Sequence, residues 1–341
     1  MDFEWIQLIQ KEWKCQVRSV RGKRKAFLLD TNRGPLFVKS YSSIEKVKWV
    51  ISLSEQLIEK GFSQTLQYIY TTRGLPFLPY LGRYYVATKA IKGRDARYSC
   101  RSDIMAAIRC LGQFHQHARH ISGGPLLRTA SAPLIAKWED RYNRFFRIIA
   151  HLKKGHYLGG LEKKIVRYAP VILSEAETAL DLARRSPLSA EYQQAVQARC
   201  VSHRDLASHN FIMDQQAAYL IDYDTAMYDT QLVDIIQMLN RTLDEQAWDF
   251  EVFADMIEEY QKMAPMTEAQ TALSFLLLRY PDNFMREVVG LYEGSLHFIP
   301  KKIESYLTMI IRNWPERSKF FQGARHFFYE EEFHSPSRFV V

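Results

Sequence analysis

Cysteine is scarce in this sequence, and no Cys-X-X-Cys pair occurs in it. The four cysteines are far apart, at Cys15, Cys100, Cys110 and Cys200. This spacing argues against a structural zinc site and against a disulfide scaffold. We therefore expect the protein to reside in a reducing compartment.

Long hydrophobic runs are also absent. No apolar run approaches the roughly 18 residues that a membrane-spanning helix needs. The stretch 1–13 carries Asp2 and Glu4 and has no uninterrupted apolar segment, so we expect an amphipathic helix there and not a signal peptide. The sequence thus predicts synthesis in the cytoplasm and no membrane partner.

No strong excess of one charge is present: 46 Lys and Arg against 38 Asp and Glu give a net charge of +8. A surplus of this size fits an anionic ligand such as a nucleotide. Proteins that bind DNA cluster their basic residues and usually show a motif, so we expect no nucleic-acid partner. With 341 residues, 47% of them hydrophobic, the chain is expected to fold as two domains or lobes.

The first 90 residues predict a small lobe that mixes strands with one helix. Residues 26–39 predict a hairpin around the turn cluster at 30–34. Apolar residues at helical spacing follow and predict a helix that Gly61 ends. Short strand-like runs come next, at 67–70 and 83–88.

From about residue 100 the pattern becomes helical, with long helices predicted at 133–154 and 160–184. The helical period breaks at 199–224, where short strand-like pieces alternate with loops. Helical patterns return at Val233 and continue to the end of the chain. The sequence therefore predicts an α+β fold in which a large helical lobe follows a small, strand-rich one.

The most informative stretch is 203–210, which reads His-Arg-Asp-Leu-Ala-Ser-His-Asn, with Ile-Asp-Tyr-Asp following at 221–224. Phosphoryl transfer needs a carboxylate that accepts the proton of the attacking hydroxyl, and oxygen ligands that hold Mg²⁺ on the phosphates. Asp205 is the candidate for the first role, as a base or a positioning group. Asn210 and Asp222 are the candidate Mg²⁺ ligands, because Mg²⁺ prefers few, hard oxygen donors.

A lysine on an early strand would complete this set. In kinases such a lysine clamps the nucleotide phosphates and pairs with a helix glutamate. Lys39 is the candidate, and the next helix offers Glu45 and Glu55. We favour Glu55, because it lies in the middle of the helix, where it can point back toward the sheet. A glycine-rich phosphate loop is nearly absent, since 20–26 holds one glycine among basic residues that either meet phosphates or form a solvated charged run.

Together these motifs resemble the aminoglycoside phosphotransferase and choline kinase superfamily, and more closely the CotS-type spore-coat kinase-like proteins. Further stretches support the resemblance, namely 37–39, 85–88, 91–94 and 111–115, with Asp229 and Asp234 after the Asp-Tyr-Asp segment. The resemblance spans most of residues 20–240.

The resemblance implies a bilobal, protein-kinase-like fold of the aminoglycoside phosphotransferase type. The small β-rich lobe would be residues 1–88 and the large helical lobe residues 89–341. ATP would bind between the lobes, with the hinge at 88–91 near the adenine and Thr88 and Ala90 as cofactor-binding candidates.

The resemblance also implies a catalytic loop at 203–210 and a metal-binding segment at 221–224. Asp205 would be the catalytic aspartate, with His203 as a second catalytic candidate. Asn210, Asp222 and Asp224 would be the candidate metal ligands. The helix that contains Asp234 would begin near that residue, which would brace the catalytic loop through backbone hydrogen bonds.

Some features depart from related families. The metal segment reads Asp-Tyr-Asp and not the Asp-Phe-Gly of protein kinases, and no Ala-Pro-Glu segment follows it. Both differences argue against an ordinary protein kinase. The catalytic loop reads His-Arg-Asp, where phosphotransferases of this superfamily usually have His-Gly-Asp.

Several residues keep a second interpretation. His203 is also compatible with a packed, hydrogen-bonded loop position, and Asp224 with a turn residue. Asp205 and Asn210 are also compatible with a loop-capping pair that has no catalytic role. His115, on the apolar face of its helix, is expected to be a core histidine and not a ligand.

The predicted function is a spore-coat-associated kinase-like protein that binds ATP and Mg²⁺ and moves the γ-phosphate to an unidentified hydroxyl acceptor. The alternative is a catalytically silent component of the coat that contacts other spore-coat proteins. In either case we expect synthesis in the cytoplasm of the mother cell, followed by assembly into the spore coat.

Overall fold

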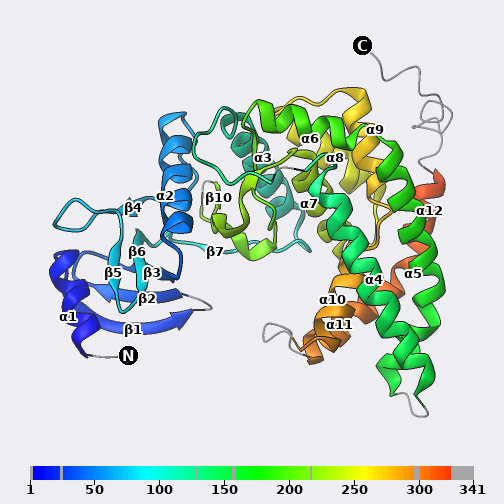
Figure 1. Cartoon of the computed structure of the whole chain (residues 1–341), viewed down its shortest axis with the longest axis horizontal. Helices are drawn as coiled ribbons and strands as arrows, with labels where there is room; N and C mark the ends of the chain where they lie inside the picture. The colour runs from blue at the N-terminus through cyan, green and yellow to red at the C-terminus, as the bar shows by residue number, and fades with distance from the viewer. Residues whose placement is uncertain are drawn as a thin grey trace.

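The computed structural model describes residues 3–23, 26–127, 129–155, 159–215, 217–294 and 300–323. Its β-rich N-terminal lobe and its large helical C-terminal lobe lie next to each other (Figure 1). The fold class predicted from the sequence is confirmed. The sequence at 329–335 also predicts a frayed end, and this stretch lies outside the described residues.

The N-terminal lobe is built on a six-stranded antiparallel sheet in the order β1-β2-β3-β6-β4, with β5 also paired to β6. Its strands are β1 Val17–Lys23, β2 Ala26–Thr31, β3 Leu36–Tyr41, β4 Tyr68–Ile69, β5 Leu78–Tyr80 and β6 Arg83–Lys89. Its helices are α1 Phe3–Glu12 and α2 Ile44–Glu59. The predicted N-terminal helix, hairpin and following helix are thus confirmed.

Residues 20–26 lie partly in a strand that was not predicted from the sequence. Residues 20–23 belong to β1, where Gly22 pairs with Phe27 and Lys23 with Ala26 of β2. Because β1 is an edge strand with most of its side chains exposed, it lacks the apolar alternation that identifies a half-buried strand.

The two faces of this sheet have different partners, which fixes the direction of Lys39. Trp5 of α1 and Val38 of β3 belong to one hydrophobic cluster on one face. Tyr41 and Val86 belong instead to the main core, together with α2 and the helical lobe. Because side chains alternate along a strand, Lys39 lies on the same face as Tyr41, toward the helical lobe.

The helical lobe contains ten helices among the described residues. These are α3 Arg101–His117, α4 Pro133–Lys154, α5 Gly160–Arg185, α6 Leu188–Gln197, α7 Leu232–Glu245, α8 Phe250–Gln261, α9 Glu268–Leu277, α10 Asp282–Tyr292, α11 Pro300–Arg312 and α12 Trp314–Gly323. The predicted helices 133–154 and 160–184 correspond to α4 and α5, a long pair at one end of the molecule (Figure 1). Within the described residues, none of the helices has the length and apolar character required to cross a membrane.

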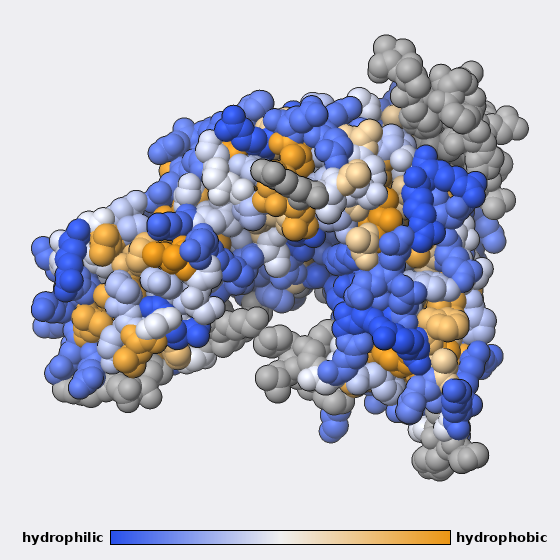
Figure 2. Space-filling view, viewed as in Figure 1, coloured by the Kyte–Doolittle hydropathy of each residue, from blue (hydrophilic) through white to orange (hydrophobic). Residues whose placement is uncertain are grey.

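Two small sheets lie where the lobes meet. One has the order β10-β9-β7, from β7 Arg94–Asp95, β9 Phe211–Met213 and β10 Ala218–Leu220. The other pairs β8 Val201–Ser202 with β11 Met227–Tyr228. Beyond this junction, the space-filling view shows a wide recess between the N-terminal lobe and the arm that contains α4, α10 and α11 (Figure 2).

Candidate functional site

The two small sheets hold the two chemically informative segments side by side. The loop 203–210 begins after β8 and ends at β9, whereas residues 221–226 begin after β10 and end at β11. Because β8 pairs with β11 and β9 with β10, each segment is anchored at both ends against the other. The backbone N–H of Ile221 also donates to the carbonyl of Asn210 at 2.9 Å.

His203 connects these segments from inside the core. Its side chain is fully buried, and Nε2 donates to the carbonyl of Ile221 at 2.9 Å. Nδ1 accepts the backbone N–H of Asp205 at 3.3 Å, which fixes the proton on Nε2. Both ring nitrogens are therefore used within the chain, as the packed interpretation of His203 requires.

Asp234 braces the start of the loop 203–210, as the resemblance implies. Its Oδ2 accepts the N–H of His203 at 2.6 Å, and its Oδ1 accepts the N–H of Arg204 at 2.7 Å. The buried His115 donates to the same carboxylate at 3.0 Å and accepts from the hydroxyl of Tyr260 at 2.7 Å. It is therefore the core histidine expected from the sequence.

The pKa values of this buried pair follow from their surroundings. Burial works to raise the pKa of Asp234, but the hydrogen bond from His115 and the backbone donors lower it below its usual value. Burial lowers the pKa of His115 and keeps the imidazole neutral, although Asp234 opposes this effect. A fixed carboxylate therefore holds the loop.

Two residues of the site have left-handed backbone conformations. Arg204 has φ +68° and Asp222 has φ +70°, a region in which residues other than glycine are strained. The first value gives a physical reason why glycine suits the middle position of the His-Gly-Asp version of the loop. Arg204 adds something that glycine lacks, because its Nε lies 3.4 Å from Oδ2 of the buried Asp229.

Asp205 is the accessible carboxylate of the loop, with 41% of its side chain exposed. Asn210 donates its amide Nδ2 to the Asp205 carbonyl at 2.8 Å, which leaves Oδ1 as the end of the amide that suits a cation. Arg241 of α7 lies 3.3 Å from Oδ1 of Asp205. Sequence reasoning missed Arg241, although its place two helical turns after Asp234 puts both residues on one face of α7.

Lys39 joins the N-terminal lobe to the segment 221–224. Its Nζ lies 2.8 Å from Oδ1 of Asp222 and 2.9 Å from Oδ2 of Asp224. The hydroxyl of Tyr41 donates to Oδ1 of Asp224 at 2.9 Å. Burial works to lower the pKa of Lys39, but the two carboxylates raise it above its usual value, and Lys39 in turn helps to lower the pKa of Asp222.

The expected pair between Lys39 and Glu55 is not formed. Glu55 instead accepts a hydrogen bond from the hydroxyl of Tyr70 at 2.5 Å, while Glu45 accepts one from Ser43. Carboxylates from the helical lobe pair with Lys39 instead. The packing of α2 also turns Glu55 toward the region of β4.

The two hinge candidates lie at the end of β6. Thr88 is buried and pairs with Phe37 of β3 and with Tyr68 of β4. The backbone N–H of Ala90 donates to the carbonyl of Pro35 at 3.0 Å, so this donor is already used within the chain. Contact of this segment with an adenine stays a prediction.

The donors at the site fit Mg²⁺ bound together with a nucleotide better than a closed metal cage. The described residues contain no group of three or more His, Cys, Asp or Glu side chains suited to a metal ion. The site offers the carboxylates of Asp222 and Asp224 and the amide oxygen of Asn210. Mg²⁺ usually takes one or two carboxylates and completes its coordination with substrate phosphates and water.

Comparison with known proteins finds matches both in sequence and in structure. The sequence profile of the family described as Spore coat putative kinase YutH matches residues 6–324. The structure is similar to an aminoglycoside phosphotransferase from Alicyclobacillus acidocaldarius, with a TM-score of 0.81 at 15% sequence identity, over 94% of this chain and 95% of that chain.

Two other solved structures extend the similarity. Spectinomycin phosphotransferase in complex with ADP and spectinomycin has a TM-score of 0.63 at 12% identity, over 92% of this chain and 98% of that chain. A choline kinase from Cryptosporidium parvum has a TM-score of 0.56 at 13% identity, over 98% of this chain and 100% of that chain. At these identities, the similarity shows that the fold is shared.

Proposed function

Because the chain belongs to the Spore coat putative kinase YutH family, we propose that it binds ATP with Mg²⁺ between its lobes and transfers the γ-phosphate to a hydroxyl acceptor. One observation carries the proposal. Lys39 from the N-terminal lobe meets Asp222 and Asp224, in a segment that the small sheets hold beside the loop with Asp205 and Asn210. This combination provides the cation, the metal ligands and the carboxylate that phosphoryl transfer needs.

Each of these side chains has a defined role in the proposed reaction. Asp205 orients the acceptor hydroxyl and takes its proton as the oxygen attacks the γ-phosphorus. The bond from phosphorus to the β–γ bridging oxygen then breaks, and its electron pair leaves with ADP. Lys39 positions the phosphates, and Asn210 and Asp222 would hold Mg²⁺, which when bound offsets the negative charge of the phosphates.

The test is thermal unfolding of the full chain with and without ATP and MgCl₂. A ligand at 100 times its dissociation constant stabilises a protein by about 2.7 kcal/mol, so we expect the midpoint to rise by a few degrees. The rise should need both ATP and Mg²⁺ and should disappear in Asp222→Asn. Asp205→Asn should keep the rise and lower any transfer rate by about 10²- to 10⁴-fold.

The absence of a shift at millimolar ATP and Mg²⁺ would contradict nucleotide binding. Transfer that continues at nearly the original rate in Asp205→Asn would contradict the role of this carboxylate. These two results are separable, because one concerns binding and the other turnover.

The family description also favours a second candidate function, a structural component of the spore coat whose role needs no turnover. Both candidates place the protein in the coat after synthesis in the mother cell, with other coat proteins as partners. They differ in whether Asp205 matters for the coat.

A further inference from the structure

Helices α4, α7 and α10 come together in the helical lobe (Figure 1). Residues of all three helices and of the loop 203–210 line a small cavity. It has a volume of about 30 Å³, enough for one or two waters or one compact polar group. Its walls are formed by Leu134, Lys137, Trp138, Arg204, Asp229, Val233, Ile236, Gln237, Asn240, Asp282 and Asn283.

The wall of the cavity is tied to the backbone on both sides of Asp205. Gln237 donates its Nε2 to the carbonyl of Arg204 at 3.3 Å, and its Oε1 accepts the N–H of Leu206 at 2.6 Å. Arg204, the residue before Asp205, itself lines the cavity. An acceptor whose hydroxyl reaches Asp205 therefore has this cavity beside it for a second group.

One cation at the cavity has no carboxylate in direct contact with it. Each guanidinium near it has an acidic partner, and the pairs are Arg204–Asp229, Arg141–Asp282 and Arg286–Glu287. Lys137 lines the same cavity and has no hydrogen bond or ion pair with any residue that the structure describes. Its ammonium group therefore forms no direct contact with a carboxylate of the described residues, although Asp282 attracts it from a greater distance.

The surroundings of Lys137 disfavour a positive charge without an added anion. Burial lowers the pKa of Lys137; Asp282 opposes this effect, but the charges of Arg141, Arg204 and Arg286 add to it. Bringing an anion beside the ammonium would relieve that repulsion.

Asn240 adds an independent observation. It is 5% exposed and lines the cavity, yet its side-chain amide makes no hydrogen bond to the described part of the chain. Buried amides are normally hydrogen-bonded, and one that faces a cavity without a partner points to a polar occupant. Its amide nitrogen is suited to donate to an oxyanion.

We propose that this cavity binds an anionic group, a carboxylate or a phosphate, of the acceptor molecule, with Lys137 and Asn240 as its donors. The proposal rests on the proposed phosphotransferase function and narrows the acceptor to a hydroxyl compound that also carries a compact negative charge. Arg204 and Gln237 are fixed next to Asp205. The hydroxyl and the anionic group of one acceptor molecule would therefore bind at neighbouring sites.

The test begins with binding of inorganic phosphate and of acetate to the full chain, measured by calorimetry in chloride buffer at constant ionic strength. Lys137→Gln removes one charge-assisted hydrogen bond and should weaken phosphate binding by about tenfold or more. Lys137→Arg should retain binding, and the near-isosteric Asn240→Asp should abolish it by placing a negative charge in the cavity.

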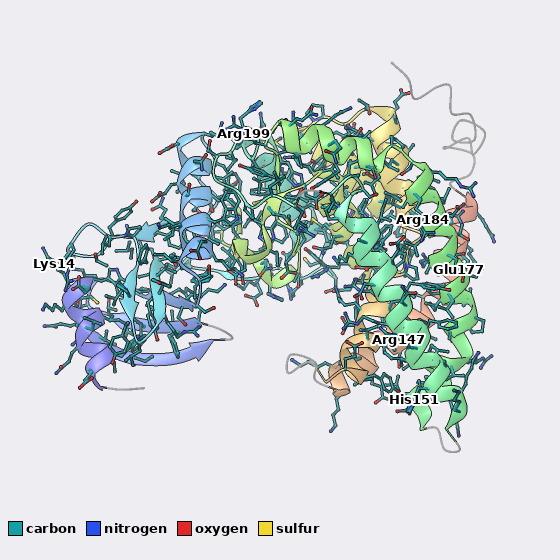
Figure 3. All side chains as sticks on the ribbon, viewed as in Figure 1. Lys14, Arg147, His151, Glu177, Arg184 and Arg199 are labelled. Carbon is teal, nitrogen blue, oxygen red and sulfur yellow. The ribbon has the colours of Figure 1, made fainter. Side chains whose placement is uncertain are left out.

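Two controls separate this site from others. Lys153→Gln removes an exposed lysine from the same helix and should leave phosphate binding unchanged. That end of α4, with Arg147 and His151, lies away from α7 (Figure 3). Lys39→Met removes the phosphate-positioning lysine of the proposed nucleotide site and therefore reports any phosphate that binds there instead. Phosphate binding that is lost in Lys39→Met but kept in Lys137→Gln would overturn the proposal.

The second part compares matched acceptors in the presence of ATP and Mg²⁺: glycerol, glycerate, glycerol 3-phosphate and choline. Transfer to glycerate alone would identify the anionic group as a carboxylate, and transfer to glycerol 3-phosphate alone would identify it as a phosphate. A preference for glycerol or choline would overturn the proposal, and so would the absence of phosphate and acetate binding. If ATP fails to bind while phosphate still binds through Lys137, the transfer reaction is contradicted and the anion site is supported.

Discussion

At the scale of single residues, Arg204 shows how one side chain serves two opposing demands. Its φ of +68° favours glycine, yet its guanidinium lies 3.4 Å from Asp229, which is 1% exposed. Burial raises the pKa of Asp229 to about 6 even though Arg204 opposes this effect. Arg204 therefore has a strained backbone conformation, and its side chain partly neutralises a buried carboxylate beside the loop.

Replacing Arg204 by glycine and by alanine separates the two effects. Both variants lose the ion pair, but only alanine keeps a Cβ in the left-handed conformation, which costs about 1 kcal/mol relative to glycine. We expect Arg204→Gly to be more stable than Arg204→Ala by about that amount. The measurement is the free energy of unfolding in urea.

The matched control is Ala136, an exposed position inside α4. Ala136→Gly should show the opposite order, a loss of about 1 kcal/mol, because glycine is the poorer residue in a helix. Equal stability of the glycine and alanine variants at Arg204 would contradict the strain argument.

At the scale of helices and strands, long elements with a regular apolar pattern could be predicted from the sequence, and short paired ones could not. The hairpin β2–β3 and the helices α4 and α5 show clear periodicity. The two-residue strands β8 and β11 are too short to have a period, and their pairing joins Ser202 to Met227 across a long sequence separation. Edge strand β1 was missed because most of its side chains face solvent.

At the site, too, some features could be predicted from the sequence and others could not. Asp205, Asn210, Asp222 and Asp234 could be placed together because they lie in one ordered motif. The partner of Lys39 was predicted wrongly, because the rotation of α2 depends on which of its residues pack in the core and not on the distance along the chain. Helix packing likewise decides which side chains line the cavity, so its residues could not be found from the sequence.

The passage from β6 to β7 depends on one glycine, which gives a prediction for an element. A Cβ on Gly93 would lie 2.3 Å from the carbonyl oxygen of Met213 in β9. This clash could be relieved only by a shift of the backbone. We expect Gly93→Ala to destabilise the protein by about 1–3 kcal/mol in urea unfolding. Gly22→Ala in β1 is the control, because no atom lies within 4 Å of a Cβ there, and it should change stability little. A similar effect at both positions would argue against the close approach of β7 and β9.

At the scale of the whole molecule, the lobes are joined by contacts besides those of Lys39. The indole N–H of Trp49 in α2 donates to the carbonyl of Ala226 at 2.8 Å. The hydroxyls of Thr65 and Tyr223 lie 2.6 Å apart. A single substitution at Asp205 or Asp222 therefore leaves much of the interface in place, so such variants test chemistry separately from folding.

This separation allows the two candidate functions to be compared in spores. If phosphoryl transfer builds the coat, Asp205→Asn and Asp222→Asn spores should show the same coat defect as a deletion. The measurement is electron microscopy of the coat layers at matched protein levels. Normal coats in both variants, together with defective coats in the deletion, would favour the structural role.

The two carboxylates on Lys39 have a thermodynamic consequence. In the proposed complex, nucleotide phosphates would have to displace Asp222 and Asp224 from the lysine, and each carboxylate released would lie uncompensated in a half-buried site unless a cation replaced the ammonium. Mg²⁺ would supply that charge, so ATP and the metal would be expected to bind together. Binding of each should then increase the affinity for the other by the same factor, as linkage requires.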